Sequence, residues 1–392
     1  MRDADPLVRV AERANPRRSF LLVSSVLGKH LPVSAARCRL AGIALGLRVV
    51  ADRRAEPARQ ALTGGDPQQV QQLIAELERE PADALPDAVV LGFAETATAL
   101  GEQVASTLDA AWFQTTTRQR SALAQAVAFK ESHSHAPEQW VAVPDAGWPT
   151  GPLLVVDDEL TTGATAARLI GVMHGHQPRD RYVVAALVDG RPDGVGPLER
   201  CASRLRTCIE VVSLERRGPQ ASLPTGWSAG TLPSRLTASL PRAPSLELHV
   251  GFPGALQHHG QSRDVRRMLD GAVDHASTQI GALPAGSLAL GTGEHLAFAQ
   301  RCAQRAGALT SSTTRSPALV SLRPGYPIRD GLAFMNPDGD DVAGYAYNLQ
   351  AGERPAVVVH FQDREHRSRG QHLLDTLHHA GAPSITVVIL AD

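Results

Sequence analysis

The stretch that decides the fold class is "GPLLVVDDELTTGATAARLI", residues 151–170. Its apolar run, residues 153–156, is typical of a strand buried in a parallel sheet, and the residues after Gly163 are typical of a helix. In an open parallel sheet, ligands bind beyond the carboxyl ends of the strands. Asp157 and Asp158 follow the run directly, so the sequence predicts two neighbouring carboxylates at a ligand-binding edge.

The residues after the acids have the composition of a phosphate-binding loop. Gly163 allows a tight turn and a close approach of the backbone to a ligand. The helix expected to begin near Thr165 points its free N–H groups at the same loop. We therefore expect a phosphate monoester to bind at Thr161, Thr162, Gly163, Ala164 and Thr165. The carboxylates of Asp157 and Asp158 could accept hydrogen bonds from sugar hydroxyls, or help to hold a Mg²⁺ ion that keeps most of its water. The whole stretch predicts a site for a ribose 5-phosphate.

Composition narrows the class of protein. A length of 392 residues suggests two domains, and 43% apolar with 20% charged residues is ordinary for a globular protein. The net charge of −1 gives no basic field for a nucleic-acid partner. Because no apolar run reaches about 18 residues, no membrane span is expected, and the charged N-terminus does not resemble a secretory signal. Four scattered cysteines suggest neither a zinc site nor a disulfide framework, so a cytoplasmic setting is expected.

Apolar runs alternate with helical patterns along most of the chain, which predicts an α/β fold with mainly parallel sheets. A segment rich in Pro, Gly and Ser, residues 216–245, interrupts the alternation and is typical of a linker. The predicted organisation is a first domain over residues 1–217, a linker over 218–245 and a second α/β domain over 246–392. Strands are expected at residues 20–23, 88–91, 153–156, 183–188, 209–213, 246–250, 287–290, 356–361 and 385–390.

An internal echo suggests that the second domain is a degenerate repeat of the first. "VVLGFAETATALGEQVA" precedes "TTTR" ending at Arg118, and "LALGTGEHLAFAQRCA" precedes "STTR" ending at Arg315. "PLLVVDD" likewise pairs with "PAVVVHF", which puts His360 and Phe361 where the first copy has its two acids. Any two α/β domains share strands that end in glycine, so duplication and chance similarity both stay open.

"VVDDELTTGAT" resembles the phosphoribosyl pyrophosphate (PRPP) motif of type I phosphoribosyltransferases, whereas the Gly-Lys-Ser/Thr of a Walker A loop is absent. "NPRRSFLLVSSVLGKHLPV", "LGFAETATALG", "FKESHSHAPEQ" and "STTRSPALV" resemble the orotate phosphoribosyltransferase-like group associated with bacterial tellurite-resistance-type gene clusters. Its members carry a C-terminal domain named for a Thr-Arg-Ser-Pro (TRSP) motif, here Thr314, Arg315, Ser316 and Pro317. The resemblance implies a type I phosphoribosyltransferase domain, with a Rossmann-like parallel sheet, followed by a TRSP domain.

The same resemblance implies transfer of ribose 5-phosphate from PRPP to a nitrogenous base, with Mg²⁺ as cofactor and pyrophosphate as product. It implies a pyrophosphate loop after the strand at residues 88–91, made of Gly92, Phe93, Ala94, Glu95 and Thr96. Glu95 could bind a metal or a cationic group, or could stabilise the dipole of the helix expected to begin at Thr96; both readings stay open.

A basic loop is expected to cover the site, with Arg118 and Lys130 as catalytic cations and Arg120, His133 and His135 nearby. Cations are needed there because charge grows on the departing pyrophosphate. The two histidines lack the spacing and the third ligand of a metal site. The N-terminal "SSVLGKHLPV" is the expected hood over the acceptor base, with Ser24, Ser25, Lys29 and His30 as its polar members.

The second domain offers Glu294, Arg315 and Ser316 as polar candidates, but without the paired acids a second active site is not expected. We expect one working site, in the first domain. The second domain would imitate a partner subunit and could contribute a cation, Arg315, to that site. Homodimer and intrachain pseudo-dimer both stay open. A PRPP-sensing regulator without turnover and a nucleotide-salvage or phosphorolysis enzyme are the alternative functions, and the sequence does not name the acceptor base.

Overall fold

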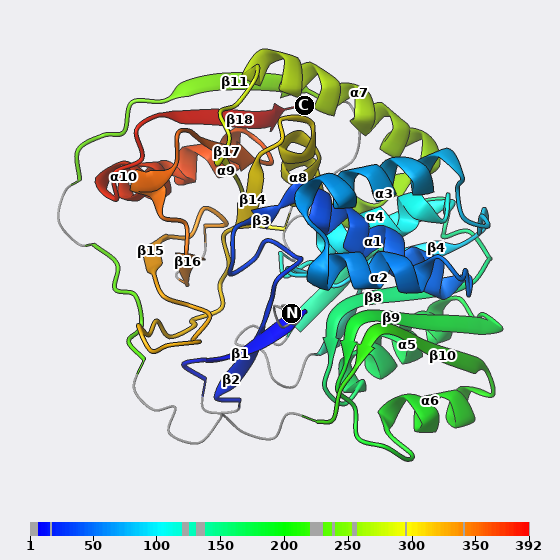
Figure 1. Cartoon of the computed structure of the whole chain (residues 1–392). Coiled ribbons are helices and arrows are strands. Elements are labelled where there is room, and N and C mark those ends of the chain that lie inside the picture. Colours follow the sequence, from blue (N-terminus) through cyan, green and yellow to red (C-terminus); the bar gives the residue numbers. More distant parts are fainter. Residues whose placement is uncertain are drawn as a thin grey trace. The chain divides into compact units, whose positions relative to one another are not determined.

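The structure is a computed structural model, shown in Figure 1, which describes residues 7–15, 18–119, 125–130, 138–219, 230–236, 240–252, 257–294, 296–339 and 342–391. The chain divides into two compact units, each built around one sheet. The first-sheet unit contains Arg39–Ala221 and Ala255–Arg266, and the second-sheet unit contains Met1–Cys38, Ser222–Gly254 and Arg267–Asp392. None of the helices in these described ranges is long and apolar enough to span a membrane.

The first sheet has six strands in the order β10-β9-β8-β4-β5-β12. Five of them are parallel, and the short edge strand β12 runs antiparallel to β5. Their central residues are buried apolar side chains, as expected for a parallel sheet covered on both faces. The strands are β4 (Val89–Gly92), β5 (Trp112–Thr115), β8 (Leu153–Leu160), β9 (Arg181–Asp189), β10 (Cys208–Arg216) and β12 (Gln261–Ser262).

Helices and one hairpin pack around this sheet. Helix α4 (Thr98–Thr107) packs on β4, β5 and β8, and α1 (Ala35–Val49) approaches it closely because Gly42 has no side chain where Gln103 lies. Figure 1 shows α5 (Ala164–His176) and α6 (Pro197–Leu205) together beside β9 and β10. The remaining elements are α2 (Ala55–Gly64), α3 (Pro67–Arg79) and the hairpin of β6 (Ala126–Lys130) with β7 (Glu138–Ala142).

The second sheet has the order β11-β18-β17-β13-β14-β3, again with five parallel strands and one antiparallel edge strand. Its elements are β3 (Val33–Ser34), β11 (Leu246–Gly251), β13 (Leu288–Gly291), β14 (Leu309–Ser312), β17 (Val357–Phe361), β18 (Ile385–Ala391), α7 (Arg263–Ile280), α8 (Leu296–Arg305), α9 (Arg364–Arg369) and α10 (Gln371–His379). Two hairpins accompany it, β1 (Val8–Glu12) with β2 (Phe20–Ser24) and β15 (Gly331–Met335) with β16 (Ala343–Tyr347). Both contribute to one apolar cluster, which includes Val23 and Tyr347.

The two sheets repeat one plan. Strands β4, β5, β8 and β9 correspond in order and direction to β13, β14, β17 and β18, and each half inserts a hairpin before its third strand of this set. The register corrects one detail of the sequence comparison: Gly92 pairs with Val156, and Gly291 pairs with His360. The acids at 157 and 158 therefore correspond to Phe361 and Gln362, one residue later than predicted. The predicted α/β class with a second α/β region is confirmed.

The edge strands are exchanged between the sequence halves. Strand β3, from the N-terminal segment, pairs with β14 of the second sheet, and β12, from the C-terminal half, pairs with β5 of the first sheet. The boundaries between the compact units accordingly fall inside α1 and α7. The division at residues 217 and 245 stays a proposal about the sequence, because each compact unit draws on both sides of it.

Some elements differ from their predicted form for clear reasons. Strand β8 continues four residues beyond 156, because Asp157 and Glu159 still pair with β9 after the pairing with β4 has ended. Helix α4 begins at Thr98 rather than at Thr96, and residues 94–97 form a turn before it. Strands β5 and β14, which end in Thr or Ser, carry too few apolar residues to stand out from periodicity.

The exchange predicts that, if the chain is divided between the exposed residues Gly218 and Pro219, the two fragments remain associated. The N-terminal fragment supplies Met1–Cys38 to the second-sheet unit, and the C-terminal fragment supplies Ala255–Arg266 to the first-sheet unit. Each fragment would otherwise leave an uncovered sheet edge. We expect the two fragments, expressed together with a tag on one, to copurify.

Gly260→Val should weaken this copurification, because Gly260 has a φ of +93° and an added Cβ would overlap the Trp112 indole. Gly251→Val is the matched control, since nothing lies within 4 Å of its Cβ position. Recovery of either fragment alone as a folded monomer would contradict the exchange.

Candidate active site

The acid pair, Asp157 and Asp158, lies where the first sheet opens. Strand β4 ends at Gly92, whereas β8 continues through both acids to Leu160 with only β9 as its partner. Both carboxylates are half-buried, and the Asp158 N–H donates to Asp157 Oδ1 at 2.9 Å. The acids therefore stand at the carboxyl edge of the sheet, beside the space that β4 leaves.

The glycine loop, residues 92–96, lies next to the acids. The Phe93 N–H donates to the Val156 carbonyl at 3.1 Å, and the Ala94 N–H donates to Thr116 Oγ1 at 2.9 Å. Gly92 is required because a Cβ there would lie 2.6 Å from the Ala97 carbonyl oxygen. The Ala94–Glu95 peptide bond is cis, and Glu95 and Thr96 are half-buried. The loop thus presents backbone groups at the edge that carries the acid pair.

One predicted cation contacts the glycine loop, and the other is next in the chain to a residue that does. Arg118 follows β5 and donates from a terminal nitrogen to the Ala94 carbonyl at 3.4 Å. Lys130 ends β6, with an exposed side chain, and its carbonyl accepts from Arg168 of α5 at 3.1 Å. The neighbouring Phe129 packs against Phe93 of the glycine loop, with ring centroids 6.0 Å apart. Arg120, His133 and His135 lie outside the described residues.

The threonine loop, residues 161–165, wraps the amino end of α5. Gly163 precedes the helix with a left-handed φ of +72°, and Thr162 Oγ1 accepts from the Ala164 N–H at 3.3 Å. An added Cβ at Gly163 would lie 2.8 Å from Leu198. The helix begins at Ala164, one residue before the predicted start. The amino end of a helix suits a phosphate group.

Sequence analysis missed one cation beside the threonine loop. The Arg191 Cδ would lie 3.3 Å from a Cβ at Gly163, and the guanidinium pairs with Asp189 at 3.0 Å and with Glu199 at 2.9 Å. Arg191 follows the carboxyl end of β9, so its position at this edge was the signal available. It adds positive charge near the loop, although two carboxylates already balance that charge.

The acid pair could hold a metal only as part of a larger coordination shell. In the part of the chain that the structure describes, no group of three or more His, Cys, Asp or Glu side chains could enclose a metal ion. Two adjacent, half-buried carboxylates fit Mg²⁺, which commonly takes one or two carboxylates together with water and substrate phosphates.

The predicted hood residues lie in the second-sheet unit. Ser24 accepts from the Val26 N–H at 3.2 Å, and Ser25 donates to the Leu7 carbonyl at 3.2 Å. The His30 carbonyl accepts from Asn348 at 2.8 Å, and the half-buried Lys29 precedes it. Burial lowers the pKa of the His30 imidazole, as do Lys29 and Arg13. An acceptor-binding role for these four residues stays a prediction, since their described contacts belong to the unit without the acid pair.

The second-sheet unit contains an ion cluster where the first has its glycine loop and Arg118. Arg315 donates to Asp338 Oδ2 at 2.7 Å, and His366 Nε2 lies 3.0 Å from Asp338 Oδ1. Burial alone raises the pKa of the Asp338 carboxyl, but the hydrogen bond and charge of His366, together with Arg315, hold it well below its usual value. Arg315 therefore has a partner within its own unit.

The remaining second-half candidates also lie at the carboxyl edge of the second sheet. Glu294 is buried at the turn after β13, and the Gly293 N–H donates to Thr313 Oγ1 at 3.2 Å, as Ala94 does to Thr116. The Ser316 N–H donates to Thr314 Oγ1, and its carbonyl accepts from the buried Tyr347 hydroxyl at 2.9 Å. The loop frame is thus retained while the acid pair is absent.

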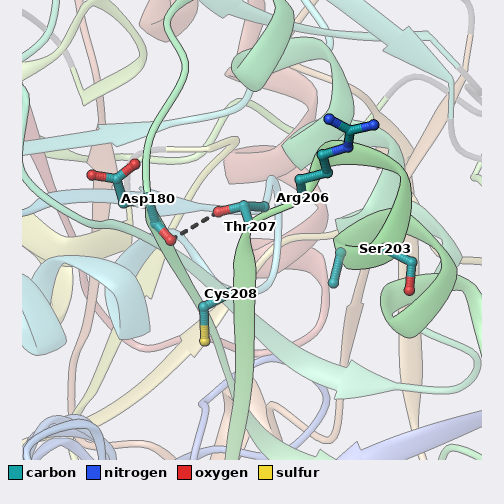
Figure 2. Close-up of a pocket in the computed structure, with 6 residues that line it drawn as sticks. Asp180, Ser203, Arg206, Thr207 and Cys208 are labelled. Atoms are coloured by element: carbon teal, nitrogen blue, oxygen red, sulfur yellow. Dashed lines mark hydrogen bonds between the residues drawn. The ribbon is translucent and has the colours of Figure 1, made fainter.

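A surface hollow in the first-sheet unit lies away from these groups. Figure 2 shows it at the amino ends of β9 and β10, lined by Asp180, Ser203, Arg206, Thr207 and Cys208, with Thr207 Oγ1 donating to the Asp180 carbonyl at 2.8 Å. Because β9 and β10 are parallel to β8, their amino ends face away from the edge that carries the acid pair. The hollow is therefore a separate feature from the candidate site.

His360 replaces an apolar residue of the first half inside the second sheet. It is 4% exposed, neither ring nitrogen has a hydrogen-bond partner among the described residues, and its ring packs edge-on against Phe298. Burial lowers the pKa of this imidazole to about 3. The unfolded chain would protonate it near pH 6.5. Between these values the unfolded state binds more protons, so the free energy of unfolding falls as the pH falls.

We expect His360→Phe to flatten the pH dependence of stability. The variant should remove a slope of up to about 1.4 kcal/mol per pH unit below pH 6. Urea unfolding at pH values from 7 to 4 measures this, with His379→Phe at an exposed histidine of α10 as the control. A slope equal to that of the unaltered protein would show that His360 is not a buried neutral group.

Comparisons with known proteins identify the family of the chain. A family model described as phosphoribosyl transferase matches residues 7–217, more than half of the chain, and a model of a TRSP domain C-terminal to it matches residues 257–377. No curated protein matches the chain. The matched ranges cut across the compact units, because β3 and β12 each lie in the unit of the other range.

Several solved adenine phosphoribosyltransferases are similar in structure. The enzyme from Rhodothermus marinus is 17% identical, with 54% of this chain and 94% of that chain covered and a TM-score of 0.33. The Giardia lamblia enzyme, complexed with 9-deazaadenine, is 12% identical, with coverages of 54% and 94% and a TM-score of 0.31. The Thermoanaerobacter pseudethanolicus enzyme is 11% identical, with 54% and 96% covered and a TM-score of 0.30. Likenesses at this level leave the substrate and site residues of the present chain undecided.

Proposed function

Because the chain belongs to the phosphoribosyl transferase family, with a TRSP domain on its C-terminal side, we propose that catalysis takes place at the acid pair of the first sheet. The chain is a phosphoribosyltransferase, which transfers the phosphoribosyl group of PRPP to a base. The observation that carries the location is the hydrogen bond from the Phe93 N–H to the Val156 carbonyl. It holds the glycine loop beside Asp157. One edge of the sheet therefore carries the threonine loop, the acid pair and the glycine loop, which are proposed to bind a phosphate, the ribose hydroxyls and pyrophosphate.

Each part of PRPP has a proposed binding group. The threonine loop, Thr161 to Thr165, binds the 5-phosphate through the amino end of α5. Asp157 and Asp158 accept hydrogen bonds from the ribose hydroxyls. The glycine loop, Gly92 to Thr96, binds the pyrophosphate at Glu95 and Thr96. The Phe93 and Ala94 N–H groups instead hold the loop in place, since they donate to Val156 and Thr116. These three groups would hold the anomeric carbon above the carboxyl end of β4.

The chemistry is a substitution at the anomeric carbon. A nitrogen of the acceptor forms a bond to that carbon while the carbon–oxygen bond to pyrophosphate breaks, and the bonding electrons leave with pyrophosphate. Arg118 and Lys130 stabilise the negative charge that grows on the leaving group. Mg²⁺, when bound, supplies further charge neutralisation of pyrophosphate, and Asp157 and Asp158 would hold it, partly through water. The acceptor nitrogen loses its proton to solvent.

The biological role we propose is synthesis of a nucleotide or nucleoside-like metabolite. PRPP and a nitrogenous base are the proposed small-molecule partners, with neither nucleic acid nor membrane as a partner. A cytoplasmic location and an orotate-like acceptor belong to the same proposal.

The direct experiment is to incubate the full chain with PRPP, Mg²⁺ and each of adenine, guanine, uracil and orotate while measuring pyrophosphate. Release that depends on a base supports the transferase and identifies the class of acceptor. Tight binding of PRPP without release by any base would support the sensing role instead. Consumption of added nucleotide by pyrophosphate would indicate that pyrophosphorolysis of a nucleotide dominates.

Asp157→Asn should lower kcat by about 10²-fold or more, because it removes a charge that acts on the reacting sugar. Asp180→Asn is the matched control, since Asp180 is an exposed acid at the opposite edge of the same sheet. Pyrophosphate release gives both rates. Equal rates for the two variants would move the active site away from the acid pair.

Gly163→Ala should raise the KM for PRPP about tenfold, because a left-handed φ of +72° costs a residue with a Cβ about 1–2 kcal/mol. The neighbouring Leu198 also crowds the new methyl group. Gly175→Ala serves as the control within the same helix, where nothing lies within 4 Å of the Cβ position. An unchanged KM for PRPP in Gly163→Ala would argue against the threonine loop as the 5-phosphate site.

A further inference from the structure

The exchange of edge strands decides which segment lies beside β5 in the sheet that carries the acid pair. Trp112 of β5 pairs with Val89, and Leu309 of β14 pairs with Leu288, so these two positions are equivalent in the repeated plan. Ser262 pairs with Trp112, and Ser34 pairs with Leu309. Ser262 and Ser34 are therefore equivalent as well. His258 lies four residues before Ser262, and His30 lies four residues before Ser34. His258 therefore occupies in the first-sheet unit the place that His30 occupies in the second-sheet unit.

The segment at residues 257–262 is firmly attached to the first-sheet unit. Gln114 of β5, which is fully buried, donates from its amide nitrogen to the carbonyls of His258 at 3.0 Å and Ala142 at 2.8 Å. The Trp148 indole donates to the amide oxygen of Gln114 at 2.9 Å. One buried side chain thus joins β5, the end of β7 and the short helix η2 (Gln257–His259).

The direction of β12 places this segment at the edge of the sheet that carries the site. Because β12 runs antiparallel to β5, the residues before Gln261 run toward the carboxyl end of β5. The glycine loop and the acid pair follow the carboxyl ends of β4 and of the paired part of β8 at this same edge. Arg118, which contacts the glycine loop, follows β5 directly.

Two histidines with different burial stand at this place. His258 is 2% exposed, whereas His259 is exposed, and their ring centroids are 4.3 Å apart. The buried ring supports the exposed one and limits its orientation. An imidazole face and its N–H groups suit a planar nitrogen heterocycle, which can stack on the ring and form hydrogen bonds with it.

We propose that His259, positioned by His258, binds the acceptor base at the working site, so that a residue from the C-terminal half of the sequence takes part in acceptor recognition. This proposal rests on the proposed location of phosphoribosyl transfer. It assigns to the segment at residues 257–262 the role that the sequence suggests for Lys29 and His30, because the exchange gives that segment the hood position in the unit with the acid pair.

The proposal can be tested by steady-state kinetics of the full chain. The acceptor is whichever of adenine, guanine, uracil and orotate gives the fastest release of pyrophosphate from PRPP. His259→Ala should raise the KM for that base about tenfold, as expected for a lost stacking contact of about 1.4 kcal/mol. The KM for PRPP should stay within about twofold of its original value. His259→Phe, which keeps a flat face, should restore most of the affinity, and His379→Ala is the matched histidine control.

Lys29→Ala provides the competing arm. If Lys29→Ala raises the KM for the base and His259→Ala does not, the proposal is overturned and the N-terminal segment is the hood. An equal rise in the KM for PRPP and for the base in His259→Ala would also overturn it, since that pattern indicates general damage to the site.

Chemical modification supplies a readout that does not need turnover. Diethyl pyrocarbonate should modify the exposed His259, and saturating AMP, GMP, UMP or orotidine 5-monophosphate should protect it while His379 stays reactive. Binding of a mononucleotide, measured by calorimetry, without protection of His259 would overturn the proposal. Failure of all four to bind would overturn the transfer site itself, so the two failures are distinguishable.

Discussion

The candidate site depends on the unequal length of two neighbouring strands. Strand β4 ends at Gly92, and β8 continues four residues beyond its last pair with β4. The hydrogen bond from the Phe93 N–H to the Val156 carbonyl closes the end of this pairing and turns the chain into the glycine loop. Because of it, a loop of backbone groups and a pair of carboxylates share one edge of the sheet. Phe129, packed on Phe93, brings the Lys130 hairpin to the same place.

The two halves share one arrangement of strands but differ in the residues at the carboxyl ends of those strands. Both keep a hydrogen bond from a loop N–H to a threonine hydroxyl, at Ala94 and at Gly293. In the first half the arginine after the next strand contacts the loop carbonyl, whereas in the second half Arg315 binds the buried Asp338. In the second half the Asp338 carboxylate thus pairs with the arginine that would otherwise be available to bind an anionic ligand. These contacts in the second half therefore fit a structural role. Its role as an intrachain partner of the first half stays a hypothesis.

Much of the fold could be predicted because its signals are local. The acid pair and the threonine loop lie within one twenty-residue stretch, so strand, loop and helix follow one another in the sequence as they do in the structure. Strand β5 was missed because two of its four residues are Gln and Thr, although all but Trp112 are buried. The repeat is detectable from glycines and arginines at similar spacing, but the predicted register was wrong by one residue, as the pairs Gly92–Val156 and Gly291–His360 show.

The sequence by itself determined the chemistry proposed for the site, because the groups proposed to bind a sugar phosphate are contiguous in the chain and their order follows from the strand, loop and helix that contain them. Only the tertiary structure decided which segments surround that site. Strand β12 lies about 150 residues from its partner β5, and the pairing of Gln261 with Phe113 leaves no periodic trace in either segment. Edge pairing is specified by backbone hydrogen bonds and by buried groups such as Gln114, which no local pattern reveals. For that reason the sequence predicted a hood at residues 24–33 without showing that this segment lies in the second-sheet unit, or that residues 257–262 lie in the first-sheet unit.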